Sequence, residues 1–142
     1  MQMSFGTLEL AERLNRDNVL LKIEALIEWE ELRPKLTGLY KRELSHGGGQ
    51  EPFDGLLMFK AILLGQWHSL SDAALEQALC VRIDFMQFCG LSLSDAIPDE
   101  TTLCRFRNRL ITNDRLDDLL ASINEQLQCH GLMIKGATGA VI

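Results

Sequence analysis

Positive charge in this 142-residue sequence is concentrated in one short stretch, residues 105–115. The stretch carries four arginines and one acid: Arg105, Arg107, Arg109, Arg115 and Asp114. Arginine forms paired hydrogen bonds with guanine and also binds phosphate, so the stretch has the side chains to contact DNA. The whole chain has a net charge of −6, which argues against a protein that is basic all over. Any DNA contact must therefore come from a local patch such as this one.

The arginines are not equivalent if residues 99–111 form a helix. At about 100° per residue, Leu103, Phe106 and Leu110 fall on one apolar arc, which predicts the side that faces the core. Four polar side chains share the outward face: Thr101, Arg105, Asn108 and Arg109. These residue types read bases in the major groove or bind phosphate, which predicts a DNA-contacting face. The alternative is an ordinary solvated face.

Two other basic positions have different predicted roles. Arg107 falls at the edge of the apolar arc, where a charge is tolerated only beside a carboxylate, so we predict a structural ion pair inside the domain. Lys41 and Arg42 fall in a predicted loop, residues 37–51. They form either a phosphate-contacting arm or part of a plain surface loop.

Neither a catalytic set nor a metal site emerges from the sequence. The most noticeable aspartates lie at expected caps and turns, where aspartate has structural uses: Asp72, Asp84, Asp95 and Asp99. The four cysteines lack C-x-x-C spacing and the three histidines are scattered, so we expect buried free thiols in a cytoplasmic protein. The longest apolar stretch, Leu56–Leu64, is shorter than the about 20 residues that cross a membrane, and no membrane partner is expected.

Helical spacing of apolar residues predicts an all-α fold around one central helix. The expected helices cover residues 8–15, 19–32, 52–66, 71–79, 83–89 and 99–111, with a last one ending at Gly131. The helix at about 52–66 is apolar on nearly every side, which is typical of a helix that others surround. Residues 71–111 could form a helix-turn-helix-like unit, although its loop 90–98 is longer than the tight turn of that motif.

Local signals predict where these helices begin and end. Pro34 is expected to end the second helix, and Pro52 suits the first turn of the central one. The expected N-caps are Ser69 or Ser71, Asp99, and Thr112 or Asn113. Gly90 and Gly131 are expected just past helix ends.

The helical pattern stops at Gly131. Residues 132–142 contain glycines and β-branched residues without a helical period, which predicts a strand-like tail. We therefore expect three parts: a helical segment with a glycine-rich loop (1–50), a helical core (51–131), and the start of a further domain (132–142). The final Ala-Val-Ile is an abrupt place to stop, which suggests a truncation.

Three segments of the sequence resemble the N-terminal domain of IS5-type insertion-sequence DDE transposases. They are Leu56–Leu64 with the following Gly65-Gln66-Trp67, Leu70–Leu79, and Phe88–Leu103 running into Phe106-Arg107. Their order and spacing fit that family, and the resemblance covers at least residues 50–142. It implies that Gly136–Ile142 leads into the first of the three acids of an RNase H-like catalytic domain, and that this chain stops one residue before that acid.

The resemblance also implies a function. The chain would be the DNA-binding and assembly part of a cut-and-paste transposase, recognising double-stranded DNA at transposon ends. It would not be an enzyme and would hold no cofactor, whereas the full-length enzyme would use Mg²⁺.

Two other functions remain open at this point. The domain could be an oligomerisation module, with the stripe Leu116–Leu127 or the N-terminal helices pairing between subunits; the acidic net charge favours this. It could also be a truncated regulator that competes with the full-length transposase.

Overall fold

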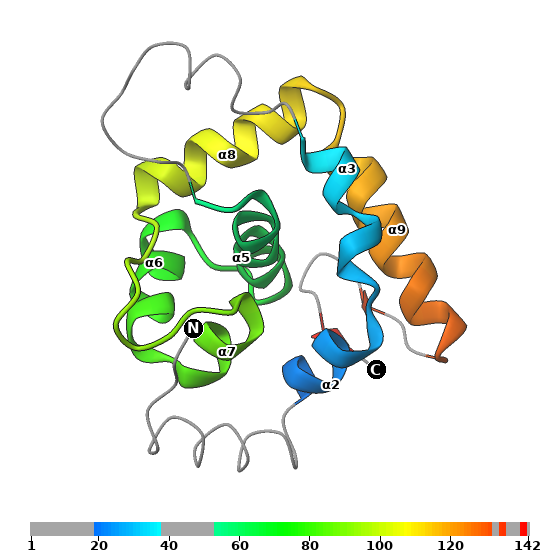
Figure 1. The fold of residues 1–142 in the computed structure, drawn as a ribbon, viewed down its shortest axis with the longest axis horizontal. Helices are drawn as coiled ribbons and strands as arrows, with labels where there is room; N and C mark the ends of the chain where they lie inside the picture. The colour runs from blue at the N-terminus through cyan, green and yellow to red at the C-terminus, as the bar shows by residue number, and fades with distance from the viewer. Residues whose placement is uncertain (1–18, 38–52, 132–133, 136–139, 142) are drawn as a thin grey trace.

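α-Helices make up almost all of the fold (Figure 1). The computed structural model describes residues 19–37, 53–131, 134–135 and 140–141. These residues form α2 (Val19–Leu26), the 3₁₀ turn η1 (Trp29–Glu31), α3 (Arg33–Leu36), α5 (Gly55–Trp67), α6 (Asp72–Val81), α7 (Ile83–Cys89), α8 (Glu100–Thr112) and α9 (Leu116–Cys129). The predicted all-α fold is confirmed. The predicted helix at 8–15, the loop with Lys41 and Arg42, and Pro52 lie outside the described residues.

Helix α5 is the centre of the domain, as predicted. Ten of its 13 residues are buried, and α3, α6, α7 and α8 all pack against it. It begins at Gly55 rather than at residue 52, because Asp54 caps it: the Asp54 carboxylate accepts a hydrogen bond from the Leu57 N–H at 3.3 Å. A helix packed on all sides holds the neighbouring helices in fixed positions.

The predicted single helix over residues 19–32 is wrong. Helix α2 ends at Leu26, and the chain turns through η1 into the short α3, with Pro34 in its first turn rather than at a helix end. The cause is the buried Trp29, whose indole Nε1–H donates to the Glu24 carbonyl at 2.9 Å and whose ring meets the Phe88 ring edge-on at 5.6 Å. Packing of this large side chain overrides the helical pattern.

Four of the described helices are followed by a left-handed residue, and three of them close in the same way. Ser69 after α5, Gly90 after α7 and Asp114 after α8 have φ values of 53°, 79° and 54°. In each case the next N–H bonds back to a carbonyl in the last turn of the helix, all at 2.8 Å. This is the Schellman arrangement, which usually has glycine at the left-handed position. Gly90 was predicted, whereas Ser69 and Asp114 were not.

The left-handed residues Ser69 and Asp114 bear on the predicted N-caps of the two helices that follow them, α6 and α9. Ser71 rather than Ser69 caps α6, accepting a hydrogen bond from the Ala74 N–H at 3.1 Å. Neither Thr112 nor Asn113 caps α9; instead, the Asn113 side-chain amide donates back to the Arg109 carbonyl at 2.7 Å. Asn113 therefore closes the end of α8 and does not open α9.

We expect Gly90→Ala to destabilise the domain by about 1 kcal/mol. A side chain at positive φ costs roughly 1–2 kcal/mol, and the stiffer unfolded chain returns part of that cost. Gly55→Ala is a matched control, because its added Cβ would make an ordinary contact at 3.4 Å with the Leu36 Cβ. That substitution should instead stabilise by about 0.4–1 kcal/mol. Urea unfolding followed by circular dichroism measures the change in the free energy of unfolding for both variants. Equal changes would contradict the explanation from the positive φ of Gly90.

Helix α9 packs on its own chain. Its apolar stripe is buried, with Leu119, Ile123 and Leu127 at most 1% exposed. Lys35 adds polar links from α3, with its Nζ 3.2 Å from an Asp118 carboxylate oxygen and 3.0 Å from the Ser122 hydroxyl. The stripe is therefore part of the domain core, and the prediction that it pairs between subunits is wrong.

The described C-terminal residues are extended. Strand β1 (Ile134–Lys135) pairs antiparallel with β2 (Ala140–Val141), which agrees with the predicted strand-like tail. The predicted end of α9 is also confirmed: the helix stops at Cys129, and Gly131 follows with a φ of 75°. None of the described helices is both long and apolar enough to cross a membrane.

Candidate nucleic-acid interface

Helix α8 is held in a defined rotation about its axis. Its N-cap is Asp99, as predicted, which accepts a hydrogen bond from the Thr102 N–H at 2.8 Å. That bond also lowers the pKa of the Asp99 carboxyl. Leu103, Phe106 and Leu110 are fully buried, so the predicted core-facing arc is confirmed. The opposite face of α8 must then point outward.

Three of the four predicted contact residues lie fully on this outward face. Thr101, Arg105 and Asn108 are exposed, whereas Arg109 is half-buried. Arg109 is therefore nearer the core than the predicted outward face suggests. The side chain of Arg105 makes no hydrogen bond or ion pair with any residue in the described part of the chain, and Asn108 donates only to the Cys104 Sγ, at 3.7 Å.

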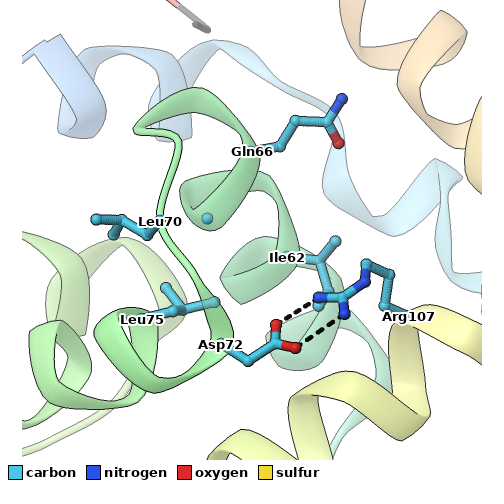
Figure 2. A pocket seen from close by; sticks show the side chains of 7 residues that line it. Ile62, Gln66, Leu70, Asp72, Leu75 and Arg107 are labelled. Atoms are coloured by element: carbon cyan, nitrogen blue, oxygen red, sulfur yellow. Dashed lines mark hydrogen bonds and ion pairs between the residues drawn. The ribbon is translucent and has the colours of Figure 1, made fainter. Parts of the chain in front are cut away.

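Arg107 has a different environment from the other arginines. Its guanidinium donates two hydrogen bonds to the two carboxylate oxygens of Asp72, the Nη2–Oδ2 bond being 2.8 Å long (Figure 2). The two side chains are 34% and 22% exposed. The hydrogen bonds from Arg107 lower the pKa of Asp72, and those to Asp72 raise the pKa of Arg107. This is the ion pair expected for Arg107, and it ties α8 to α6.

A shallow pocket of about 220 Å³ lies beside this ion pair (Figure 2). Its other lining residues are Ile62, Gly65, Gln66, Leu70 and Leu75. Gly65 allows α5 and α6 to approach closely, since a Cβ there would come within 3.0 Å of the Leu75 Cδ2. The charged groups of the pocket already neutralise each other, so the pocket offers no free charge for a nucleic acid.

The N-terminal end of α8 is acidic. At the N-terminal end, Asp99 and Glu100 are joined by Glu76 of α6, whose Oε1 accepts the Glu100 N–H at 2.8 Å. Arg105 lies near the middle of the helix, Arg109 lies in its last turn, and Arg115 follows the helix between the exposed Asp114 and Asp117. Glu76 had no signal in the sequence, because it reaches α8 from a neighbouring helix 24 positions earlier in the chain.

Four other basic side chains of the described residues are neutralised locally. Arg33 pairs with Glu30 and Asp54, Lys35 with Asp118, and Arg82 with Asp84. Lys60 is buried, bonded to Glu24 at 3.2 Å and placed 4.5 Å from the centre of the Trp29 ring. These side chains hold the fold together, which leaves α8 as the better candidate for an interface.

The three-helix unit expected at 71–111 does not pack like two helices joined by a tight turn. Helix α8 packs mainly on α6 and α5, and residues 90–99 separate it from α7. Contacts of α6 with both α7 and α8 hold the three helices together. The helix-turn-helix-like reading of this unit stays a prediction.

Metal and thiol chemistry have little support in the described part of the chain. No group of three His, Cys, Asp or Glu side chains there is placed to hold a metal ion. The cysteines are free thiols, but only Cys89 is buried, where burial raises its pKa to about 12; Cys80 and Cys129 are exposed and Cys104 is intermediate. The expectation of buried thiols is therefore wrong for three of the four.

A family model described as "Transposase domain (DUF772)" matches residues 8–109. The matched range takes in the central helix and α8 as far as Arg109. No solved structure matches the chain.

Proposed function

The chain belongs to this family of transposase domains, and from that membership we propose that it binds the double-stranded DNA of transposon ends for a cut-and-paste transposase. One observation supports the outward face of α8 as the DNA-contacting surface. Arg105 lies exposed on the outward face of α8, and its side chain has no polar partner among the described residues. Phosphate oxygens and base edges are the DNA groups that arginine binds.

Rigidity supports α8 as the contacting element. Its N-terminus is capped by Asp99, its inner face is buried, and Arg107 ties it to α6. Side chains on a fixed helix lose less conformational entropy on binding than side chains on a loop, so the same contacts give tighter binding.

A titration with Arg105→Ala tests this proposal. We expect the substitution to weaken binding to a transposon-end duplex by about fivefold or more, while the melting temperature changes by no more than about 1 °C, because the side chain is exposed. Fluorescence anisotropy against transposon-end and scrambled duplexes at two salt concentrations gives the affinities. Lys22→Ala is the matched control: it removes the same charge from α2, on the other side of the domain (Figure 1). Equal effects of the two variants would overturn the choice of α8.

We further propose that the chain binds DNA without cutting it, and that the IS5-type catalytic acids belong to a separate RNase H-like domain of the parent enzyme. Two-metal phosphoryl transfer needs carboxylates that converge on the ions, whereas Asp99 caps α8, Asp72 pairs with Arg107, and Glu76 accepts the Glu100 N–H. Purified chain with Mg²⁺ or Mn²⁺ should therefore neither nick nor join transposon-end DNA in a gel assay. Metal-dependent nicking that copurifies with the chain would refute this.

Assembly is a second candidate function, favoured by the net charge of −6. The buried stripe of α9 does not serve it, so subunits would have to pair through other surfaces. A size measurement by light scattering beside the DNA titration separates the two roles: a dimer that ignores DNA would favour assembly. A chain that binds DNA without cutting it would also compete with the full-length transposase for that DNA. The proposed function is therefore compatible with the regulatory role.

A further inference from the structure

One stripe of polar side chains runs along the whole outward side of α8. Its members are spaced four, three and four residues apart, which places them on one face of a helix, and all are exposed: Thr101, Arg105, Asn108 and Thr112. Thr112 was not among the residues expected on this face, and it extends the stripe to the last residue of the helix. Helix α8 lies along one edge of the domain (Figure 1) and packs on α5, α6 and α9 through its other side. The stripe is therefore not covered by any described element.

The stripe carries little charge. Arg105 is its single charged member. Part of that charge is balanced by Asp99: hydrogen bonds with Thr102 lower the pKa of the Asp99 carboxyl most, and the positive charge of Arg105 lowers it further. Proteins that hold a DNA backbone do so chiefly through several lysines and arginines, which replace the counterions of the phosphates. One partly balanced arginine is too little charge for that kind of binding.

The stripe does offer hydrogen bonds. The Asn108 amide donates only to the Cys104 thiol, a weak acceptor, at 3.7 Å, so its oxygen and its second N–H remain available. Asparagine pairs with the donor and acceptor edge of adenine, arginine pairs with the two acceptors of guanine, and threonine contacts either base. A phosphate in the DNA backbone only accepts hydrogen bonds, so it would leave the amide oxygen of Asn108 unused. Base edges therefore match these side chains better than phosphates do.

The dimensions of the stripe match a short run of base pairs. At about 1.5 Å per residue, the distance along the helix from Thr101 to Thr112 is about 16 Å, which corresponds to about five base pairs of about 3.4 Å each. Arg105 and Asn108 are about 4.5 Å apart along the axis, which places them at neighbouring base pairs. The major groove is about 12 Å wide and admits an α-helix, and it is the groove in which all the base pairs can be distinguished.

We infer that the outward stripe of α8 lies in the major groove and reads the base sequence directly, with Arg105 on a guanine and Asn108 on an adenine of the neighbouring base pair. Thr101 and Thr112 flank these two contacts. The inference rests on the proposed function and deepens it, because it names the part of the DNA that the site recognises. Contacts that hold the phosphate backbone then come from other parts of the chain.

Selection from a randomised DNA duplex library tests the inference. The full chain should enrich duplexes that carry guanine and adenine at neighbouring positions within a site of about five base pairs. Asn108→Ala should lose the preference for the adenine and Arg105→Ala the preference for the guanine, and the affinity of each for the selected duplex should fall by about fivefold or more. Asn124→Ala is the matched control, because it removes the same amide from the exposed side of α9; it should keep both preferences. Circular dichroism checks that each variant is folded.

A modified base tests the adenine contact at the level of one atom. The base 7-deazaadenine lacks the N7 acceptor to which asparagine donates. At the selected adenine it should weaken binding of the unsubstituted chain by about threefold or more, and it should not weaken binding of Asn108→Ala further. The slope of log K against log salt should be the same in Asn108→Ala as in the unsubstituted chain, because the amide replaces no counterion.

The outcomes separate this inference from the proposed function. If the unsubstituted chain binds no duplex at low salt, both are overturned. If it binds but enriches no sequence, or if its preferences survive both Arg105→Ala and Asn108→Ala, the stripe does not read bases. The inference is then overturned, and DNA binding by the chain still stands.

Discussion

Replacing Leu63 by alanine should lower the free energy of unfolding by about 2–5 kcal/mol, the usual range for a buried leucine that leaves a cavity. Leu63 is fully buried in α5, which four other helices contact. A cavity there cannot close by movement of one neighbour, because several elements would have to shift together. Urea unfolding, followed by circular dichroism and by the fluorescence of Trp29 and Trp67, gives the change.

Leu57→Ala is the control for this prediction. Leu57 belongs to the same helix but is only partly buried, so the same truncation should cost clearly less. A loss below about 1 kcal/mol for Leu63→Ala, or equal losses for the two variants, would mean that α5 is not the centre of the core.

Arg107→Ala should lower stability by about 1–3 kcal/mol and leave the DNA affinity of the folded protein unchanged. The loss comes from the paired hydrogen bonds to Asp72 and from the carboxylate left without a partner. Both side chains are partly exposed, at 34% and 22%, so solvent screening keeps the effect below that of a fully buried pair. A double-mutant cycle with Asp72→Ala isolates the pair: the double variant should be much less destabilised than the sum of the singles.

The same ion pair gives a pH dependence with a defined sign. Arg107 lowers the pKa of Asp72 in the folded state below its ordinary value of 3.8. The pair therefore contributes its full stability above about pH 4 and loses it as the pH falls through the lowered folded pKa. Unfolding free energies measured between pH 2 and 6 should fall less steeply toward acid in Asp72→Asn than in the unsubstituted chain. If the free energy of unfolding falls equally steeply toward low pH in both proteins, the ion pair is not the cause of that fall.

Helices with strong local signals could be predicted from the sequence. Helix α8 has an aspartate cap and a clear apolar arc, and α7 ends at a glycine, so both were predicted within one residue. The break after α2 could not be predicted, because it follows from the packing of Trp29 against Phe88, a contact made across the chain. The left-handed Ser69 and Asp114 were missed for another reason: serine and aspartate more often mark a helix start.

The candidate site was predictable only as far as it depends on one helix. The helical wheel correctly separated the exposed Arg105 from the inward Arg107. It could not name Asp72 as the partner, since the two residues are 35 positions apart and meet only when α6 packs on α8. For the same reason it missed Glu76, and with it the three carboxylates at the N-terminal end of α8.

The N-terminal segment of the fold has a consequence for biosynthesis. Glu28 bonds to Gln126, 98 positions later in the chain, and α2 packs on α7 and α9. Ribosomes add about 5–20 residues per second, so roughly 5–20 s pass between the synthesis of these two partners. During that time the apolar side chains of α2 and Trp29 lack the surfaces that later bury them. Docking of α2 therefore cannot be completed until α9 has been synthesised, and until then the nascent chain exposes a surface that chaperones can bind.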